Sequence, residues 1–173
     1  MKKKILIIIP FAVLFTIIFL IPTNMHTVSE YMIVPIDSMV EVTDVIVIAQ
    51  VESTYPVLRT YDDELELRIW TKTILKPEKF LKNEDGLNPE SNIETIAEGG
   101  KILLYNHESN SAKFQAGERV LVFLDKDSNS IMGDDYYVVW GPIGKYLLND
   151  GMAENIISER TMSETKLISL ISG

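Results

Sequence analysis

The chain of 173 residues contains no cysteine and only two histidines, His26 and His107. Without cysteine there is no disulfide, no thiolate nucleophile, no lipid attached through sulfur and no zinc site with cysteine ligands. The two histidines are far apart in unlike sequence surroundings, so we interpret them as surface residues rather than as a metal-binding pair. The composition thus predicts no cofactor.

Basic residues are scarce as well, and three of them stand together at the start. Of the 16 lysines and arginines, three are Lys2, Lys3 and Lys4, which leaves 13 basic against 25 acidic residues and a net charge of −12 for the remainder. Such an acidic surface repels phosphate backbones. The remaining lysines are dispersed and do not predict the basic, aromatic groove of a single-strand-binding protein. Nucleic acid is therefore excluded as an expected partner.

Charged residues are missing altogether from Ile5–Pro22, where only Thr16 is polar. A helix of this length spans about 27 Å, close to the hydrocarbon thickness of a bilayer. The stretch is longer than a signal-peptide core and lacks an A-x-A-like cleavage site. We expect a signal anchor or transmembrane helix at residues 1–22, single-pass in the cell membrane. The preceding lysines predict a cytoplasmic N-terminus and an outside C-terminal domain; the alternative is secretion after signal-peptide cleavage.

A polar tether at residues 23–37 precedes a β-rich region, which we predict as an extracytoplasmic domain at residues 38–173. Alternating or continuous apolar segments, bounded by turn residues, predict about seven strands in a small antiparallel barrel or sandwich. Pro77 is expected to end the second strand, since proline cannot donate to a ladder. The expected strands are Asp44–Thr54, Glu64–Leu75, Asn92–Glu98, Lys101–Asn106, Glu118–Leu124, Tyr136–Trp140 and Lys145–Leu148.

Apolar residues change to a helical spacing near the C-terminus. Asp150 is a suitable cap, and the apolar residues that follow predict an amphipathic helix at about 150–172, with a break near residues 161–165 as an alternative. These apolar residues are Met152, Ile156, Ile157, Leu167, Ile168 and Ile171. The fold class predicted from the sequence is therefore mainly β, with a C-terminal amphipathic helix and one N-terminal transmembrane helix.

Several sequence blocks between Val42 and Gly151 occur in a recognisable order. They contain Asp44, Thr71 or Thr73, Leu75-Lys76, Gly99-Gly100, Phe114, Gly117-Glu118, Phe123-Leu124 and Gly144-Lys145. This order resembles a family of exported small β domains of archaea and bacteria, with the block FQAGERVLVFL as its most specific part. The pattern departs from that family at Ala49-Gln50 and at Pro77, where the family has glycine.

That family is similar in layout to the netrin-like module of the tissue inhibitors of metalloproteinases. The resemblance implies an OB-like barrel with helices at its ends, and it implies no agreed molecular function. The inhibitors chelate the protease metal through an N-terminal cysteine amine, and this chain has no cysteine. No residue is therefore assigned that role.

Ser38 is a candidate nucleophile, because a Ser-Met shortly after a membrane anchor is typical of a membrane-bound signal peptidase. Such an enzyme also needs a Pro-Thr turn, a Gly-Asp strand and a lysine or histidine base, and the sequence DSMVEVTDVIVI lacks these elements. We interpret Ser38 as the cap of a short helical turn, with Glu41 completing a capping box. A serine peptidase using Ser38 remains the catalytic alternative.

Two further motifs have a chemical and a structural interpretation. Asp125, Asp127 and Asn129 occupy positions 1, 3 and 5 of a calcium loop, but Ser130 replaces the glycine of position 6 and Tyr136 the glutamate of position 12. These three residues are therefore a weak calcium candidate, and the alternative is a solvated connection between strands. The S-x-x-K pattern of Ser163–Lys166 lacks the companion motifs of β-lactamase-type enzymes and is interpreted as a chance match.

The sequence thus predicts a membrane-anchored, extracytoplasmic β-barrel module that binds a protein or a cell-envelope component and is not an enzyme. No residue is assigned a catalytic, cofactor-binding or firm metal-binding role. The alternatives are the serine peptidase and a weakly calcium-binding surface domain.

Overall fold

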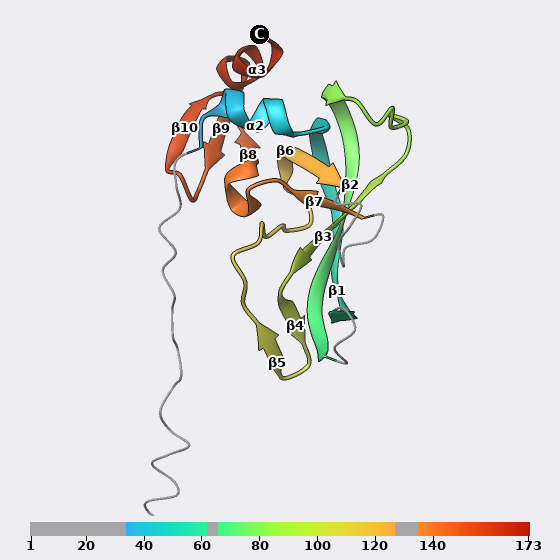
Figure 1. Ribbon diagram of the computed structural model, residues 1–173. Helices are drawn as coiled ribbons and strands as arrows, with labels where there is room; N and C mark the ends of the chain where they lie inside the picture. The colour runs from blue at the N-terminus through green and yellow to red at the C-terminus, as the bar shows by residue number, and fades with distance from the viewer. Residues whose placement is uncertain (1–33, 62–65, 127–134) are drawn as a thin grey trace, which may run out of the picture. The chain divides into compact units, whose positions relative to one another are not determined.

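Two long antiparallel strands, β1 (Val45–Tyr61) and β2 (Glu66–Asn83), are the longest elements of the fold (Figure 1). The computed structural model describes residues 34–61, 66–126 and 135–173. Both strands were predicted from their apolar and alternating residues, and both are longer than predicted. Their distal parts, residues 54–61 and 66–73, extend beyond the pairing of β1 with β6, and we call them the β1–β2 arm. Within the arm, residues 70–73 of β2 also pair with β3.

Pro77 does not end β2, so the prediction of a strand end there is wrong. The strand continues to Asn83, and Pro77 lies opposite Ala49 beside a register shift between Ile48 and Ala49. The residue left out of the ladder at this shift is Glu78, and Pro77 itself lies opposite Ala49. Proline is found within strands at such bulges, where the regular hydrogen bonding is already interrupted.

Five strands pair in a circular order. β2 pairs with β3 (Ile93–Glu98), β3 with β7 (Tyr136–Val138), β7 with β6 (Arg119–Lys126), and β6 returns to pair with β1. All of these pairings are antiparallel except β3–β7, which is parallel and consists of the single pair Thr95 and Tyr136. The pairing order therefore leads back to the strand from which it began.

The core consists of two hydrophobic clusters that share the strands β1 and β6. Alternate residues of these strands enter different clusters because successive side chains of a strand point to opposite faces. One cluster has residues from all five strands of the circular order: Val45, Val47, Ala49, Val51, Leu75, Ile93, Val120, Val122, Leu124, Tyr136 and Val138. The other includes Ile46, Ile48, Leu121 and Phe123. The apolar runs predicted as strands at Asp44–Thr54 and Glu118–Leu124 are thus buried on both faces over Val45–Ala49 and Val120–Leu124.

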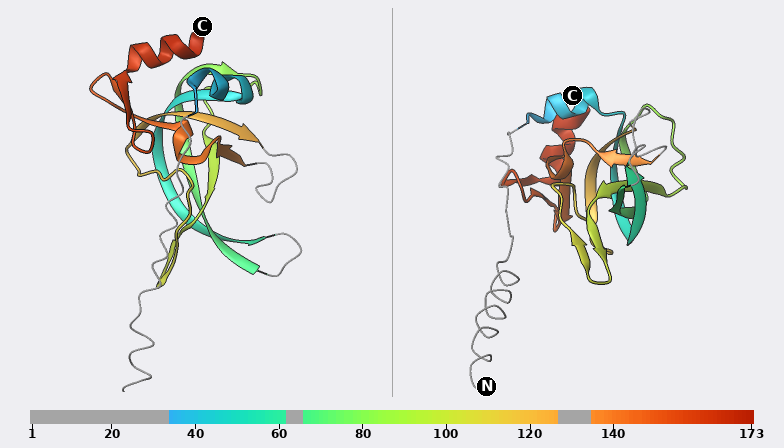
Figure 2. Two further views of the ribbon diagram at one scale, coloured as in Figure 1. Left: turned by 60° about the vertical axis from the view of Figure 1, so that its left-hand side comes forward. Right: turned by 60° about the horizontal axis from the view of Figure 1, so that its bottom comes forward.

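The second cluster is covered by two short helices at one end of the domain, α2 (Ile36–Val42) and α3 (Glu164–Ser172) (Figures 1 and 2). Met39 and Leu167 are fully buried in it. The α3 N-terminus is capped by Ser163, whose side chain accepts a hydrogen bond of 3.2 Å from the Lys166 backbone N–H. The S-x-x-K pattern is therefore a local helix cap.

The prediction of a helix at about 150–172 is wrong for its first half, because α3 begins only at Glu164. After the 3-10 turn η1 (Gly141–Gly144) and β8 (Lys145–Asn149), the chain forms the hairpin β9 (Met152–Asn155) and β10 (Arg160–Ser163). β8 and β9 are themselves joined by a two-residue turn, Asp150-Gly151. Both residues have positive φ, of 49° and 75°, as such a turn between antiparallel strands requires. Asp150 is thus a turn residue and not a helix cap.

A second short hairpin replaces the single strand predicted at Lys101–Asn106. It consists of β4 (Gly100–Ile102) and β5 (Tyr105–His107), which pair only with each other. Ile102 lies opposite Tyr105, so Leu103 and Leu104 form the turn. The described residues contain ten strands in all, rather than about seven.

The transmembrane prediction concerns residues outside the described ranges. Within residues 34–61, 66–126 and 135–173, no helix is both long enough and apolar enough to cross a bilayer. The anchor at residues 1–22 stays a prediction, and so does His26 as a surface residue.

Candidate binding cleft

An open cleft of about 360 Å³ lies beside the β1–β2 arm. One wall is formed by Thr54, Tyr55 and Pro56 of β1, where this strand has passed the end of its pairing with β6. The end of β3, the β4–β5 hairpin and the segment 108–114 form the rest. The cleft thus opens where the chain that leads into β6 departs from β1.

Two glycines shape the floor of this cleft. Gly99 and Gly100 have φ angles of 99° and 144°, which side-chain-bearing residues rarely adopt. A Cβ atom at Gly100 would lie 2.6 Å from Thr71 Oγ1, and one at Gly99 would lie 2.9 Å from the carbonyl oxygen of His107. Only glycine therefore lets the chain turn from β3 into a hairpin packed closely on β2.

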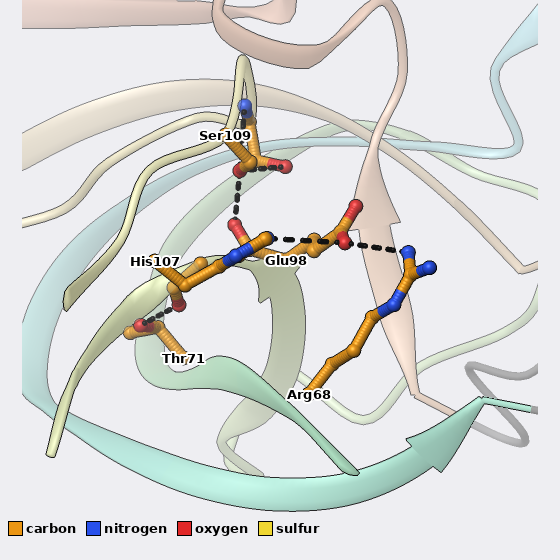
Figure 3. A network of polar contacts seen from close by, with 7 residues as sticks. Arg68, Thr71, Glu98, His107 and Ser109 are labelled. Carbon is orange, nitrogen blue, oxygen red and sulfur yellow. Dashed lines mark hydrogen bonds and ion pairs between the residues drawn. The ribbon is translucent and has the colours of Figure 1, made fainter. Parts of the chain in front are cut away.

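A network of polar contacts surrounds Glu98 at the edge of the cleft (Figure 3). Its Oε1 atom accepts a hydrogen bond of 3.1 Å from Arg68 and lies 3.2 Å from Nε2 of His107. The Ser109 hydroxyl donates to the backbone carbonyl of Glu98, and Thr71 Oγ1 donates to that of Gly99 at 2.7 Å. These contacts connect β2, β3, β5 and the following loop.

The network is arranged for holding the chain rather than for nucleophilic catalysis. An activated serine needs its hydroxyl hydrogen-bonded to a base, whereas the Ser109 hydroxyl donates to a backbone carbonyl. His107 faces the carboxylate of Glu98, which also pairs with Arg68. Among the described residues, no serine or threonine hydroxyl is hydrogen-bonded to a histidine nitrogen. The side chain of His107 is 42% exposed, so its predicted surface position is confirmed.

A second, apolar groove adjoins the cleft and shares Asn106 and His107 with it. Its volume is about 640 Å³, and it lies between the β1–β2 arm and the β4–β5 hairpin. Leu58, Leu67 and Ile69 line it from the arm, and Ile102 and Tyr105 from the hairpin. We call the cleft and the groove together the concave surface. The β4–β5 hairpin, which contributes to both, lies at the end of the domain away from α2 and α3 (Figure 1).

Ser38 lies elsewhere, exposed on α2. The helix begins at Ile36 after Pro35, and no side chain caps it, so the expected role of Ser38 as a helix cap is wrong. Within the described part of the chain, the Ser38 hydroxyl has no lysine or histidine as a hydrogen-bond partner. Residues 34–61, 66–126 and 135–173 therefore provide no activating base for this serine.

The side chain of Asp125, the first residue of the calcium candidate, lies near the carboxylates of Asp44 and Asp85. A hydrogen bond with Asp125 raises the pKa of Asp44, and burial and the negative charges of Asp125 and Asp85 raise it further. The hydroxyl of Tyr136 donates to Asp85; burial first, and then this contact, raises the pKa of Tyr136.

The other two calcium candidates, Asp127 and Asn129, lie outside the described residues. The described part contains no group of three or more side chains placed to hold a metal ion. Calcium binding by these three residues stays a prediction.

The residues of the family-like blocks meet beside the cleft. Lys145 Nζ lies 2.6 Å from Glu118 Oε2 and 4.6 Å from the ring centroid of Phe114, and it donates to the carbonyl oxygen of Lys113. Burial lowers the pKa of Lys145, although the contact with Glu118 opposes this shift. The contacts hold the segment that forms one wall of the cleft against β8.

Sequence reasoning did not find the cleft. Its walls come from β1, β3 and residues 106–114, and nothing in the sequence pattern brings these segments together. The available signal is the Gly99-Gly100 pair, because adjacent glycines allow the positive φ angles with which the chain leaves β3.

Comparison with known proteins does not assign the chain to a family. No family model matches it, and no curated protein or solved structure is detectably similar.

Proposed function

We propose that the chain is a membrane-anchored extracytoplasmic module that binds a protein or another cell-envelope component without catalysing a reaction. The observation that carries this proposal is the concave surface formed by the cleft and the apolar groove, where the side chains of Thr71, His107 and Ser109 make hydrogen bonds within the fold. Concave, partly apolar surfaces with a few polar groups are typical of binding sites. The membrane anchor is the predicted helix at residues 1–22.

We further propose that the β domain is an OB-like barrel. The circular order β1-β2-β3-β7-β6, with one parallel contact, supports this proposal, as does the core cluster that draws on all five strands. OB-like barrels bind elongated ligands on one face and with adjacent loops. The two helices at one end agree with the layout implied by the netrin-like resemblance.

The shape of the surface favours an extended ligand. The cleft follows β1 from Thr54 to Pro56, and the groove continues along the arm past Leu58. A segment of protein or a linear envelope polymer would contact both hollows, with apolar groups in the groove. Nucleic acid is disfavoured because the net charge beyond the first four residues is −12.

Photocrosslinking tests the proposal with a matched control. A photoreactive amino acid replaces Tyr55 in the cleft or Leu170 on α3, two side chains that are both 41% exposed. In the native envelope, we expect a discrete adduct from position 55 and none from position 170. Thr54→Trp, which fills the cleft, should remove the adduct. Equal adducts from both positions, or none from position 55, would contradict the proposal.

A second experiment tests the proposal that the chain catalyses no reaction. A fluorophosphonate probe should not label the protein in its native membrane. Labelling that disappears in Ser38→Ala would show that the serine peptidase alternative is correct.

A further inference from the structure

The turn of the β4–β5 hairpin exposes an unusual amount of apolar surface. Leu103 is 87% exposed, Leu104 97% and Tyr105 78%. Leu58 and Leu67 on the neighbouring arm are 55% and 63% exposed. Single exposed apolar residues are ordinary, but a contiguous group of this kind marks a surface that contacts something apolar.

The same turn is also strained. Leu103 has a φ of 54°, in the left-handed region that glycine or asparagine adopts with little cost and leucine does not. A two-residue turn with positive φ at its first central residue favours glycine at that position. The chain therefore accepts both backbone strain and exposure of two leucines at one turn, and folding alone explains neither.

We propose that this turn inserts into the interfacial region of the membrane that holds the N-terminal helix. The proposal rests on the membrane anchor of the proposed function and adds a second, reversible lipid contact to it. Tyrosine is favoured at the membrane interface, where its ring is apolar and its hydroxyl stays wet. Lys101 is exposed at the base of the hairpin and can extend its ammonium group toward the aqueous phase.

The length of the tether allows this contact. The described domain begins at Val34, next to α2, whereas the hairpin lies at the opposite end (Figures 1 and 2). Residues 23–33 span at most about 36 to 40 Å when fully extended. A domain the size of Tyr31–Gly173 has a diameter of roughly 35 to 40 Å. The anchored domain can therefore lie along the bilayer with the hairpin turn at its surface.

The charge of the domain determines which lipid surface fits. With a net charge of −12 beyond the lysines of the N-terminus, the exported part is repelled by anionic lipids. The contact is therefore apolar, through Leu103 and Leu104, and we expect it on zwitterionic bilayers and less of it as the anionic lipid content rises. In this position the cleft and the groove open close to the membrane surface.

The absence of cysteine makes the test direct. The full chain is reconstituted in phosphatidylcholine nanodiscs as three single-cysteine variants, Leu104→Cys, Leu170→Cys and Phe15→Cys, each labelled with an environment-sensitive fluorophore. Brominated phosphatidylcholine quenches labels that reach the acyl chains. We expect a shift to shorter wavelength and quenching at positions 104 and 15, and neither at position 170.

Each result separates this inference from the proposed function. Quenching at position 15 but not at position 104 would overturn the hairpin contact and leave the anchor in place. No quenching at either position would remove the anchor and the inference that rests on it. A wavelength shift at position 104 without quenching would assign the turn to a second copy or another protein, and the lipid contact would be wrong.

A second variant guards against a general effect of the label. Leu103→Asn with Leu104→Gly keeps a two-residue turn and removes both leucines. A label at Tyr105→Cys should be quenched in the parent chain and lose most of this quenching in the Asn-Gly variant. Unchanged quenching would show that the two leucines do not make the contact.

Discussion

Lys145 and Glu118 form a largely buried ion pair, with 2.6 Å between Nζ and Oε2 and side chains that are 10% and 19% exposed. Phe114 covers the same ammonium group. Together, the three residues hold the segment before β6 against β8. The block FQAGERVLVFL, which contains Phe114 and Glu118, therefore supports the wall of the cleft.

Removing this lysine should destabilise the domain. In Lys145→Met, the carboxylate of Glu118 keeps its hydrogen bond from the Gln115 backbone N–H but loses its cation, and we expect a loss of about 2 kcal/mol in the free energy of unfolding. Urea denaturation measures it. Lys76→Met, at an exposed position of β2, is the control and should change stability by less than about 0.5 kcal/mol. Equal effects of the two substitutions would show that the ion pair does not stabilise the fold.

The pair of Arg119 and Glu164 predicts a dependence of stability on pH. The hydrogen bond from Arg119 lowers the pKa of Glu164 below its usual 4.5, so the native state binds this proton more weakly than the unfolded state. The resulting stabilisation is fully present above about pH 4.5 and disappears as the pH falls through the lowered pKa.

In Glu164→Gln we therefore expect a loss of about 1 kcal/mol near pH 7, small because Arg119 is 36% exposed. The difference from the parent chain should shrink toward zero in acid. Denaturation curves recorded between about pH 3 and about pH 7 measure this difference in the free energy of unfolding. This range includes the usual carboxyl pKa values. A difference that is independent of pH would refute the charge-based explanation.

Asp44 should make the stability depend on pH in the opposite direction from Glu164. Because the hydrogen bond with Asp125 and the neighbouring negative charges raise its pKa above 3.8, the native state binds this proton more tightly than the unfolded state. Stability from this group therefore falls as the pH rises through the raised pKa. Asp44→Asn should increase the midpoint of thermal unfolding at pH 7 slightly, because solvent screens the charges around this carboxyl group, with no gain in acid. A lower midpoint at neutral pH would contradict this explanation.

Gly100 should tolerate substitution less well than a glycine in open space. A Cβ atom at Gly100 would clash with Thr71 Oγ1, whereas one at Gly86, which also has positive φ, would meet nothing within 4 Å. We expect Gly100→Ala to cost about 2 to 4 kcal/mol and Gly86→Ala about 1 kcal/mol. Similar losses for both variants would show that the hairpin can move away from β2.

Replacing the strained leucine turn should increase the stability of the domain. Leu103→Asn with Leu104→Gly removes the left-handed leucine, and we expect the free energy of unfolding to rise by up to about 1 kcal/mol. Calorimetric unfolding of the parent and variant chains measures this change. A clear loss of stability would mean that the leucines pack within the fold, and the reason given for their exposure would be wrong.

The comparison of sequence and structure shows which patterns were informative. The apolar runs in β1 and β6 were predicted correctly because only a strand buried on both faces needs two apolar faces in so short a segment. The region after Asp150 was predicted wrongly because the helical spacing of its apolar residues outweighed Asp150-Gly151, which is a strong hairpin signal.

The cleft could not be predicted for a different reason. The sequence around Leu103 and Leu104 has the apolar, β-prone character of a buried strand, and its turn contains none of the usual turn residues. Only the pairing of Ile102 with Tyr105 shows that the two leucines are at a turn. The candidate site thus depends on contacts that local patterns do not encode.

The burial of β1 on both faces has a consequence for how this chain folds. In a strand with one apolar face, a slip of one residue exposes that face to water, so the pattern itself protects the register. In the Val45–Ala49 part of β1, the same slip only exchanges one apolar side chain for another. Correct pairing must therefore be selected by local irregularities, namely the register shifts along β1 and the proline opposite Ala49.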